Sequence, residues 1–122
     1  MPKLALVVDD SKIMCEMIAV KLKAMSFEVT SAFDGVQGVD KASKEKFDVI
    51  ITDINMPNMD GIELIRLLRD NGANKFTPVL VLTTEGSDEA KKRGKAAGAS
   101  GWIVKPFKPE VLEAAVTKVC GL

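Results

Sequence analysis

The sequence contains no histidine among its 122 residues. This absence excludes Ser-His-Asp and Cys-His catalysis, zinc sites with histidine ligands, and a phosphohistidine on the chain itself. Cysteine is scarce as well, and the two that are present, Cys15 and Cys120, have no metal-ligand spacing. Both fall in helical patterns, so we expect reduced, packed thiols of the kind found in cytosolic proteins.

Long hydrophobic runs and a net charge are also lacking. No apolar run approaches the ~20 residues that are needed to span a bilayer. The start of the chain has neither the apolar core nor the small-residue cleavage site of a signal peptide. Lys plus Arg equals Asp plus Glu, at 17 each, so no overall basic field draws the protein to nucleic acid or to an anionic membrane. We expect a cytoplasmic protein that neither binds nucleic acid nor inserts into a membrane.

Apolar residues are plentiful enough for one core. They make up 47% of the 122 residues, which is sufficient for a single domain. No internal repeat, low-complexity tract or linker divides the chain. We therefore expect one domain over residues 1–122, with no output domain after it.

Strand and helix patterns alternate five times along the chain. The expected strands are Leu4–Asp9, Phe27–Ser31, Phe47–Asp53, Pro78–Thr83 and Ser100–Val104. Apolar residues at helical spacing mark four of the helices: Met14, Met17, Ile18, Leu22 and Met25 after an N-cap at Ser11; Val36, Val39 and Ala42 after the turn at Asp34-Gly35; Ile62, Ile65 and Leu68, ending at Asn71-Gly72; and Val111, Leu112, Ala115, Val116 and Val119 after Pro109. A further helix, from about Asp88 to Ala97, is expected before the fifth strand with only Ala90 and Ala97 as apolar anchors. Phe27–Ser31 has alternating character, but the other strands are largely apolar, and with helices between them they predict a parallel α/β sheet that is covered on both faces.

Charged side chains follow three of these strands. Asp9 ends the first strand and Asp10 follows it, Asp53 ends the third strand, and Lys105 follows the fifth. The carboxyl ends of parallel strands share one edge of a sheet, where ligands bind. Carboxylates that converge there repel one another, and without a counter-ion one or more should stay protonated. A divalent cation relieves the repulsion, and ligands that are all oxygen suit Mg²⁺. The pattern predicts a metal-assisted phosphoryl site.

Four short motifs carry a resemblance to a known family. They are Asp9–Ser11, Asp53–Gly61, Thr83–Glu85 and Gly101–Phe107. In this order and spacing, from Leu4 to the last helix, the chain resembles the response-regulator receiver domain, and within it the stand-alone, CheY-like chemotaxis type. The resemblance implies a flavodoxin-like, doubly wound fold: a five-stranded parallel sheet in the order 2-1-3-4-5 with five helices.

The same resemblance implies a phosphorylation-dependent switch of a two-component system in chemotaxis. Asp53 would be the nucleophile that takes a phosphoryl group from a histidine kinase or a small acyl phosphate. Asp10, Asp53 and the main-chain carbonyl of Asn55 would bind Mg²⁺ directly, and Asp9 through water. Lys105 would bring its charge to the phosphoryl oxygens, and the Lys105-Pro106 bond would be cis, as it is in the family.

Residues beside this site are candidates for switching and tuning. The hydroxyl of Thr83 would bind a phosphoryl oxygen and pull the following loop inward. Trp102 stands where the family more often has Tyr or Phe. It is interpreted as an aromatic side chain that turns inward with Thr83, as one that packs on the fourth helix, or as both. Thr84 is bulkier than the Ala, Ser or Gly often found there and should restrict access, while Asn55 and Glu85 occupy positions that tune hydrolysis.

The resemblance also implies partners. The phosphoryl donor would be a histidine kinase, and the target would be a protein such as a flagellar motor switch component. A phosphatase could remove the phosphoryl group, and the protein itself is expected to be a monomer. The target would bind a face formed by the fourth helix, fifth strand and fifth helix. Few apolar anchors hold the fourth helix, which predicts mobility, and its basic residues 91–95 are either a site for an acidic partner or a solvated face.

Other functions are weighed against this one. The chain is expected to be a phospho-acceptor rather than an enzyme, with Mg²⁺-dependent self-phosphorylation from small donors and self-dephosphorylation. A phosphorelay intermediate is the nearest alternative. A phosphatase of the haloacid-dehalogenase type would need an acid where Asn55 stands, and a cap domain. An FMN carrier is disfavoured by Asp9 and Asp10, which repel phosphate, and a receiver that acts as an unphosphorylated scaffold ranks last.

Overall fold

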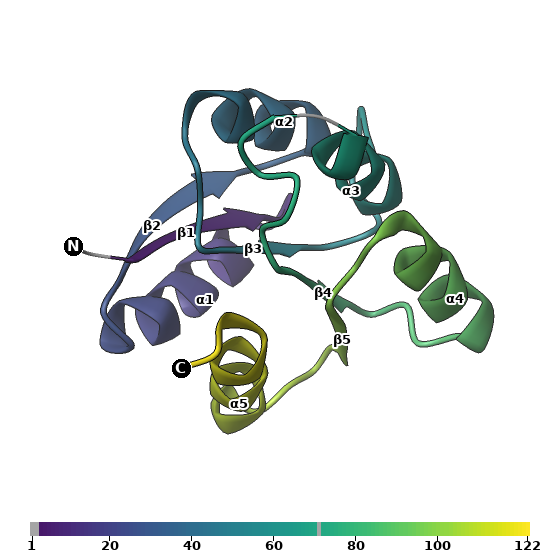
Figure 1. Ribbon diagram of the computed structural model, residues 1–122. Coiled ribbons are helices and arrows are strands. Elements are labelled where there is room, and N and C mark those ends of the chain that lie inside the picture. The colour runs from purple at the N-terminus through teal and green to yellow at the C-terminus, as the bar shows by residue number, and fades with distance from the viewer. Residues whose placement is uncertain (1–2, 71) are drawn as a thin grey trace.

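The computed structural model describes residues 3–70 and 72–122, in which five strands alternate with five helices (Figure 1). The strands are β1 (Lys3–Val8), β2 (Phe27–Ala32), β3 (Val49–Thr52), β4 (Val79–Thr83) and β5 (Gly101–Val104). The helices are α1 (Lys12–Ala24), α2 (Gly35–Lys44), α3 (Gly61–Asp70), α4 (Asp88–Ala97) and α5 (Pro109–Cys120). All ten predicted elements are present, although β1 and β3 end one residue before the aspartates that the prediction included. Asn71, where the third helix was expected to end, lies outside the described residues.

The strands form one parallel sheet in the order β2-β1-β3-β4-β5, as predicted. Helices α2, α3 and α4 cover one face of the sheet, and α1 and α5 cover the other (Figure 1). In β1, Leu6 and Val8 belong to the core on the first face, while Ala5 and Val7 belong to the core on the second. Because both faces are covered, the inner strands β1, β3 and β4 have no solvent side, which explains their continuous apolar sequences.

Local sequence signals start the helices where they were expected. Ser11, Asp34 and Ser87 each cap a helix by accepting a hydrogen bond from a backbone N–H three residues on. Pro109 occupies the first turn of α5, where its missing N–H costs no hydrogen bond. No helix in the described ranges is long and apolar enough to cross a membrane.

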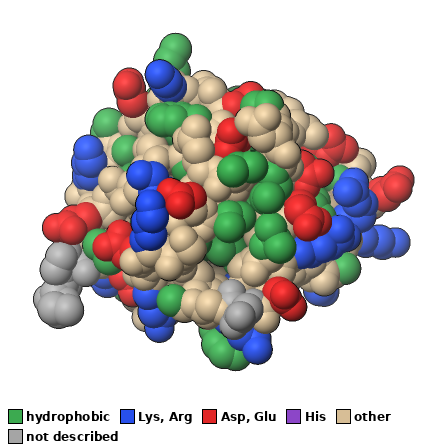
Figure 2. All heavy atoms as spheres, turned by 90° about the horizontal axis from the view of Figure 1, so that it is seen from above, with side chains coloured by type: hydrophobic (Ala, Val, Ile, Leu, Met, Phe, Trp, Pro, Cys, Tyr) green, Lys and Arg blue, Asp and Glu red, His purple; other side chains and the backbone are tan. Residues whose placement is uncertain are grey.

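Some apolar residues that were assigned to buried helix stripes are instead exposed. Met17, Val36 and Val111 have exposed fractions of 56%, 50% and 47%. On α1 the buried positions are Cys15, Ile18 and Leu22, so these residues face the core and Met17 lies outside the buried face. Helical spacing identifies an apolar face, but tertiary packing decides which edge of that face reaches the sheet. Hydrophobic side chains also remain visible on the outer side of α2 and α3 (Figure 2), where Val36 and Leu67 are exposed.

Two polar side chains tie together segments that are distant in the sequence. Asn74 is 2% exposed; it accepts hydrogen bonds from the Phe47 N–H and the Thr77 hydroxyl and donates to two carbonyls at the end of α2. Arg69, near the end of α3, donates from Nε and Nη2 to the carbonyl of Gly98 at 3.1 and 2.9 Å. Gly98 is the C-cap of α4, so this pair of bonds fixes the C-terminal end of α4 to α3.

Candidate functional site

The acidic residues that were predicted to converge do so. β1 and β3 are neighbours with Val8 opposite Thr52, so the next residue on each strand, Asp9 and Asp53, emerges at the same sheet edge. One carboxylate oxygen each from Asp9, Asp10 and Asp53 lie within 4.8 Å of one another. Three oxygen ligands at this spacing fit a hard divalent cation. The structure therefore confirms the predicted acidic cluster.

Lys105 reaches the acidic cluster from the carboxyl end of β5, at the same edge of the sheet. It follows β5, where its N–H donates to the Thr83 carbonyl at 2.7 Å and its bond to Pro106 is cis, as expected. Its Nζ lies 2.7 Å from Asp9 Oδ2 and 3.1 Å from Asp53 Oδ2. All three side chains are nearly buried, at 12% exposure for Lys105, 3% for Asp9 and 12% for Asp53. The convergence of Lys105 with these acids was predicted, whereas its direct ion pairs with Asp9 and Asp53 were not specified.

The ammonium group of Lys105 is the counter-ion that the acidic cluster requires. Burial raises the pKa of Asp9, and hydrogen bonds from Lys105 and from the Ser11 N–H only partly oppose this effect. Burial also disfavours the charged form of Lys105, but hydrogen bonds to Asp9 and Asp53 outweigh it and raise the pKa of the amine. Lys105 therefore stays protonated between two carboxylates that would otherwise repel each other.

The two acids after β1 have different surroundings. Asp9 is buried and uses both oxygens, one accepting from Lys105 and the other from the Ser11 N–H at 2.9 Å. Asp10 is exposed, as is Asn55 beyond β3. Asp53 accepts from the Ile54 N–H through Oδ1 at 2.6 Å and from Lys105 through Oδ2. The site is thus enclosed on the side of Asp9 and open on the side of Asp10 and Asn55.

The backbone of Glu85 connects the predicted switch residues Thr83 and Trp102. Thr83 is fully buried, and its Oγ1 accepts from the Glu85 N–H at 3.3 Å. The indole N–H of Trp102 donates to the Glu85 carbonyl at 2.9 Å. Thr84, between them in sequence, is exposed. The loop after β4 is therefore held by one bond from its own strand and by another from β5.

Trp102 packs on α4 over a glycine. A Cβ at Gly94 would lie 2.5 Å from Cζ3 of the indole, closer than real contacts allow. The structure confirms the interpretation that Trp102 packs on the fourth helix; its rotation stays a prediction. The matching role of Gly94 was missed, although an isolated glycine inside a helical pattern signals close packing.

Two residues that hold the loop between β3 and α3, Asn58 and Met59, were not identified from the sequence. Asn58 donates from Nδ2 to Oδ2 of Asp34 at 2.7 Å, and the Gly35 N–H donates to the Met59 carbonyl at 3.2 Å. The pair Asp34-Gly35 was recognised only as a turn. A contact to residue 58 has no local signal, because the two loops are 24 residues apart.

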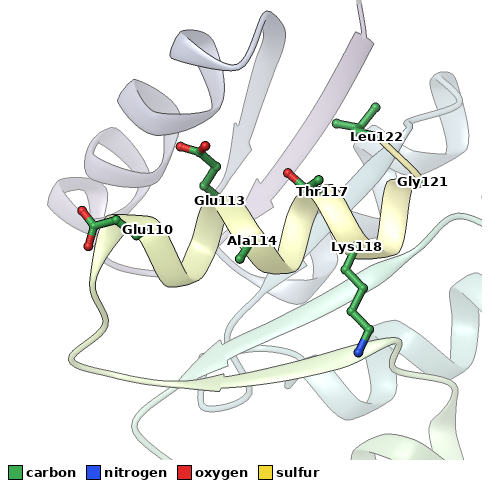
Figure 3. A pocket seen from close by; sticks show the side chains of 7 residues that line it. All are labelled: Glu110, Glu113, Ala114, Thr117, Lys118, Gly121 and Leu122. Carbon is green, nitrogen blue, oxygen red and sulfur yellow. The ribbon is translucent and has the colours of Figure 1, made fainter.

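A surface hollow of about 610 Å³ lies along α5, away from this cluster (Figure 3). It is lined by Glu110, Glu113, Ala114, Thr117, Lys118, Gly121 and Leu122. Its charged side chains point in different directions instead of converging (Figure 3), and Glu113 forms an ion pair with Lys21 of α1. None of the predicted site residues borders it.

Comparisons with known proteins agree with the geometry. A family model, the response regulator receiver domain, matches residues 5–117. The chain is 37% identical to chemotaxis protein CheY1 of Helicobacter pylori over 118 residues, which is 95% of each chain. A structure of the chemotaxis response regulator CheY4 of Vibrio cholerae matches with a TM-score of 0.91 and 46% identity, covering 98% of this chain and 99% of that one.

Two further matches show the range of proteins with this domain. The receiver domain of the sensor histidine kinase PA1611 from Pseudomonas aeruginosa, solved with a magnesium ion in its active site cleft, matches with a TM-score of 0.90 at 25% identity over all of both chains. The probable transcriptional regulatory protein TcrX of Mycobacterium tuberculosis is 33% identical over 109 residues, 89% of this chain. This chain spans 46% of the length of TcrX.

Proposed function

The chain belongs to the response regulator receiver domain family of two-component signalling, and from this premise we propose that it is a phosphorylation-dependent switch in which Asp53 accepts a phosphoryl group. One arrangement carries the proposal: Asp53 lies in an acidic cluster and within 3.1 Å of the Lys105 ammonium. A carboxylate nucleophile, oxygen ligands for a cation and a fixed positive charge are the parts that phosphoryl transfer to an aspartate requires.

The chain's own residues prepare Asp53 for the transfer. Hydrogen bonds from the Ile54 N–H and from Lys105 hold the two carboxylate oxygens. One oxygen attacks phosphorus, the bond from phosphorus to the donor nitrogen or oxygen breaks, and the donor leaves as imidazole or as a carboxylate. Mg²⁺, bound by Asp10, Asp53 and the Asn55 carbonyl with Asp9 acting through water, would supply neutralising charge. The Lys105 ammonium group then exchanges its hydrogen bond to the Asp53 carboxylate for hydrogen bonds to the new phosphoryl oxygens.

Phosphorylation would be transmitted through Thr83. Its buried hydroxyl donates to a phosphoryl oxygen, and its movement draws in the Glu85 N–H to which it is bonded. Because Trp102 is bonded to the carbonyl of the same residue, the shift reaches β5 and the face of α4, β5 and α5. A hydrogen bond to a charged group contributes on the order of 1.5–3 kcal/mol, which before the cost of rearrangement corresponds to a shift of about one or two decades in the population of a two-state loop.

Chemotaxis relatives support a role in that pathway. We infer that a histidine kinase is the phosphoryl donor, that the target is a protein such as a flagellar motor switch component, that a phosphatase resets the signal, and that the protein acts in the cytoplasm as a monomer. A phosphorelay intermediate would pass its phosphoryl group to a histidine on another protein instead. A pull-down with and without beryllofluoride, a phosphoryl mimic, separates the two, because a motor-type target would bind only the activated form.

The nucleophile is tested by intact mass. Acetyl phosphate with Mg²⁺ should add one phosphoryl group to the wild type and to Asp40→Asn, an exposed acid on α2 that serves as a control. Asp53→Asn should add none, and EDTA should prevent the reaction in all samples. Undiminished labelling of Asp53→Asn would remove Asp53 as the acceptor. Steady release of phosphate from small esters would instead favour the phosphatase alternative.

A further inference from the structure

We propose that Asp34 and Asn58 are positioning residues for the cation site: they clamp the loop between β3 and α3 and so raise its affinity for Mg²⁺. The inference rests on the proposed function, because the loop carries the main-chain carbonyl of Asn55, the third protein ligand proposed above. Neither Asp34 nor Asn58 would touch the cation. Their effect would be to keep the Asn55 segment in one place beside Asp53.

The base of the loop is closed tightly. The Gly61 N–H donates to the Ile54 carbonyl at 2.9 Å, and a Cβ at Gly61 would lie 2.0 Å from the Asp53 carbonyl oxygen. Only a glycine permits this approach of two backbones. Asn55 therefore leaves the sheet from a fixed point, directly after the phospho-acceptor.

The tip of the loop has an unusual backbone. The Met59 N–H donates to the Pro57 carbonyl at 2.7 Å, which makes a three-residue turn centred on Asn58. Asn58 has φ = 67°, in the left-handed region. A γ-turn with positive φ is rare and strained, and such a conformation persists only where its surroundings impose it.

The start of α2 imposes this conformation. Asn58 Nδ2 lies 2.7 Å from Asp34 Oδ2, while Asp34 Oδ1 accepts from the Gln37 N–H at 2.8 Å as the cap of α2. The Gly35 N–H donates to the Met59 carbonyl, and a Cβ at Gly35 would lie 2.5 Å from that oxygen. Hydrogen bonds from the Gln37 backbone and from Asn58 lower the pKa of Asp34, so the carboxylate that holds the tip stays charged.

Asn55 thus lies between two anchored points, the base at Ile54 and Gly61 and the tip at residues 57–59. A loop released at its tip would have to be ordered each time the Asn55 carbonyl bound a cation, and that ordering weakens binding. Outer-shell residues of this kind typically change metal affinity by about 10- to 100-fold. The clamp therefore prepares the ligand before the cation arrives.

The test removes the clamp without straining the backbone. Asn58→Gly keeps a residue that tolerates positive φ but lacks the side chain, and Mg²⁺ binding is measured by calorimetry on protein whose fold is checked by circular dichroism. We expect about a tenfold weaker affinity. Ser26→Gly is the matched control, because Ser26 is the other described non-glycine residue with positive φ, at 71°, and lies after α1. Its Mg²⁺ affinity should equal that of the wild type.

A swap separates positioning from a general structural role. Asn58→Asp alone places two carboxylates face to face and should weaken Mg²⁺ binding at least as much as Asn58→Gly. The double variant Asp34→Asn, Asn58→Asp restores a donor opposite an acceptor and retains a good helix cap, so it should recover most of the affinity. Wild-type affinity in Asn58→Gly, or no recovery in the swap, would overturn the clamp. Absence of Mg²⁺ binding by the wild type would overturn the proposed function together with it.

Discussion

Replacing Gly94 with alanine tests the packing of Trp102 through the sign of a stability change. In the interior of an ordinary helix, alanine is more favourable than glycine by about 1 kcal/mol, so Gly94→Ala would stabilise α4 if nothing lay above it. Here the new methyl group would meet the indole, at 2.5 Å from Cζ3 and 3.0 Å from Cε3. The ring cannot shift freely, since its N–H is bonded to the Glu85 carbonyl.

The expected magnitude follows from two opposing effects. Overpacking a filled space typically costs about 1–3 kcal/mol, and the gain in helix propensity offsets about 1 kcal/mol of this. Gly94→Ala should therefore lower the free energy of unfolding by roughly 1 kcal/mol. In a Trp102→Leu background the ring is gone, and the same substitution should raise the free energy of unfolding by up to about 1 kcal/mol.

Urea unfolding followed by far-UV circular dichroism measures both backgrounds, because Trp102→Leu removes the only tryptophan fluorescence. Ala96→Gly, at an exposed position on the same helix, is the matched control and should cost about 1 kcal/mol whether or not Trp102 is present. Stabilisation by Gly94→Ala of equal size in both backgrounds would refute the proposed contact.

Two further predictions concern the titration of buried or capped groups. Burial foremost raises the pKa of the Cys15 thiol to about 11, and the residue is 2% exposed. Iodoacetamide at pH 8 should therefore modify the less buried Cys120 first, and equal rates of modification by peptide mass would contradict this. The pKa of Asp34 is lowered in the folded state. Its ionised carboxylate therefore stabilises the fold at pH values above 3.8, the pKa in the unfolded chain. This stabilisation is lost as the pH falls through the lower pKa of the folded state. Asp34→Ala should therefore destabilise the protein more at pH 7 than at pH 3 in thermal melts, and a pH-independent difference would contradict the assignment.

Much of the fold was predictable because its signals are local. Continuous apolar strands indicate a sheet buried on both faces, and helices between them indicate parallel order. The cluster of Asp9, Asp10 and Asp53 follows from the same logic, since residues just after parallel strands share an edge. The strand order came instead from the resemblance to a family, because no local pattern specifies which strands become neighbours.

The features that were missed depend on contacts between distant segments. Lys105 was expected to converge with the acids, but which carboxylate it contacts most closely is decided by how β5 sits beside the rest of the sheet. Asn74 is as polar as any surface residue, and only the assembled fold gives it buried partners. The exposure of Met17 likewise depends on the angle at which α1 packs, because its neighbour Ile18 suits the same pattern.

The two bonds from Arg69 to Gly98 determine how α4 is able to move. They secure the end of the helix that is remote from the loop after β4, while the opposite end begins at Ser87, next to that loop. A pull on the loop would act at the end of the helix opposite to Gly98, and we expect α4 to tilt about Gly98 rather than slide. Over a helix of 10 residues, about 15 Å long, a displacement of ~1 Å at Ser87 corresponds to a tilt of roughly 4°. The side chains near Ser87 would travel farthest and those near Ala97 would stay in place.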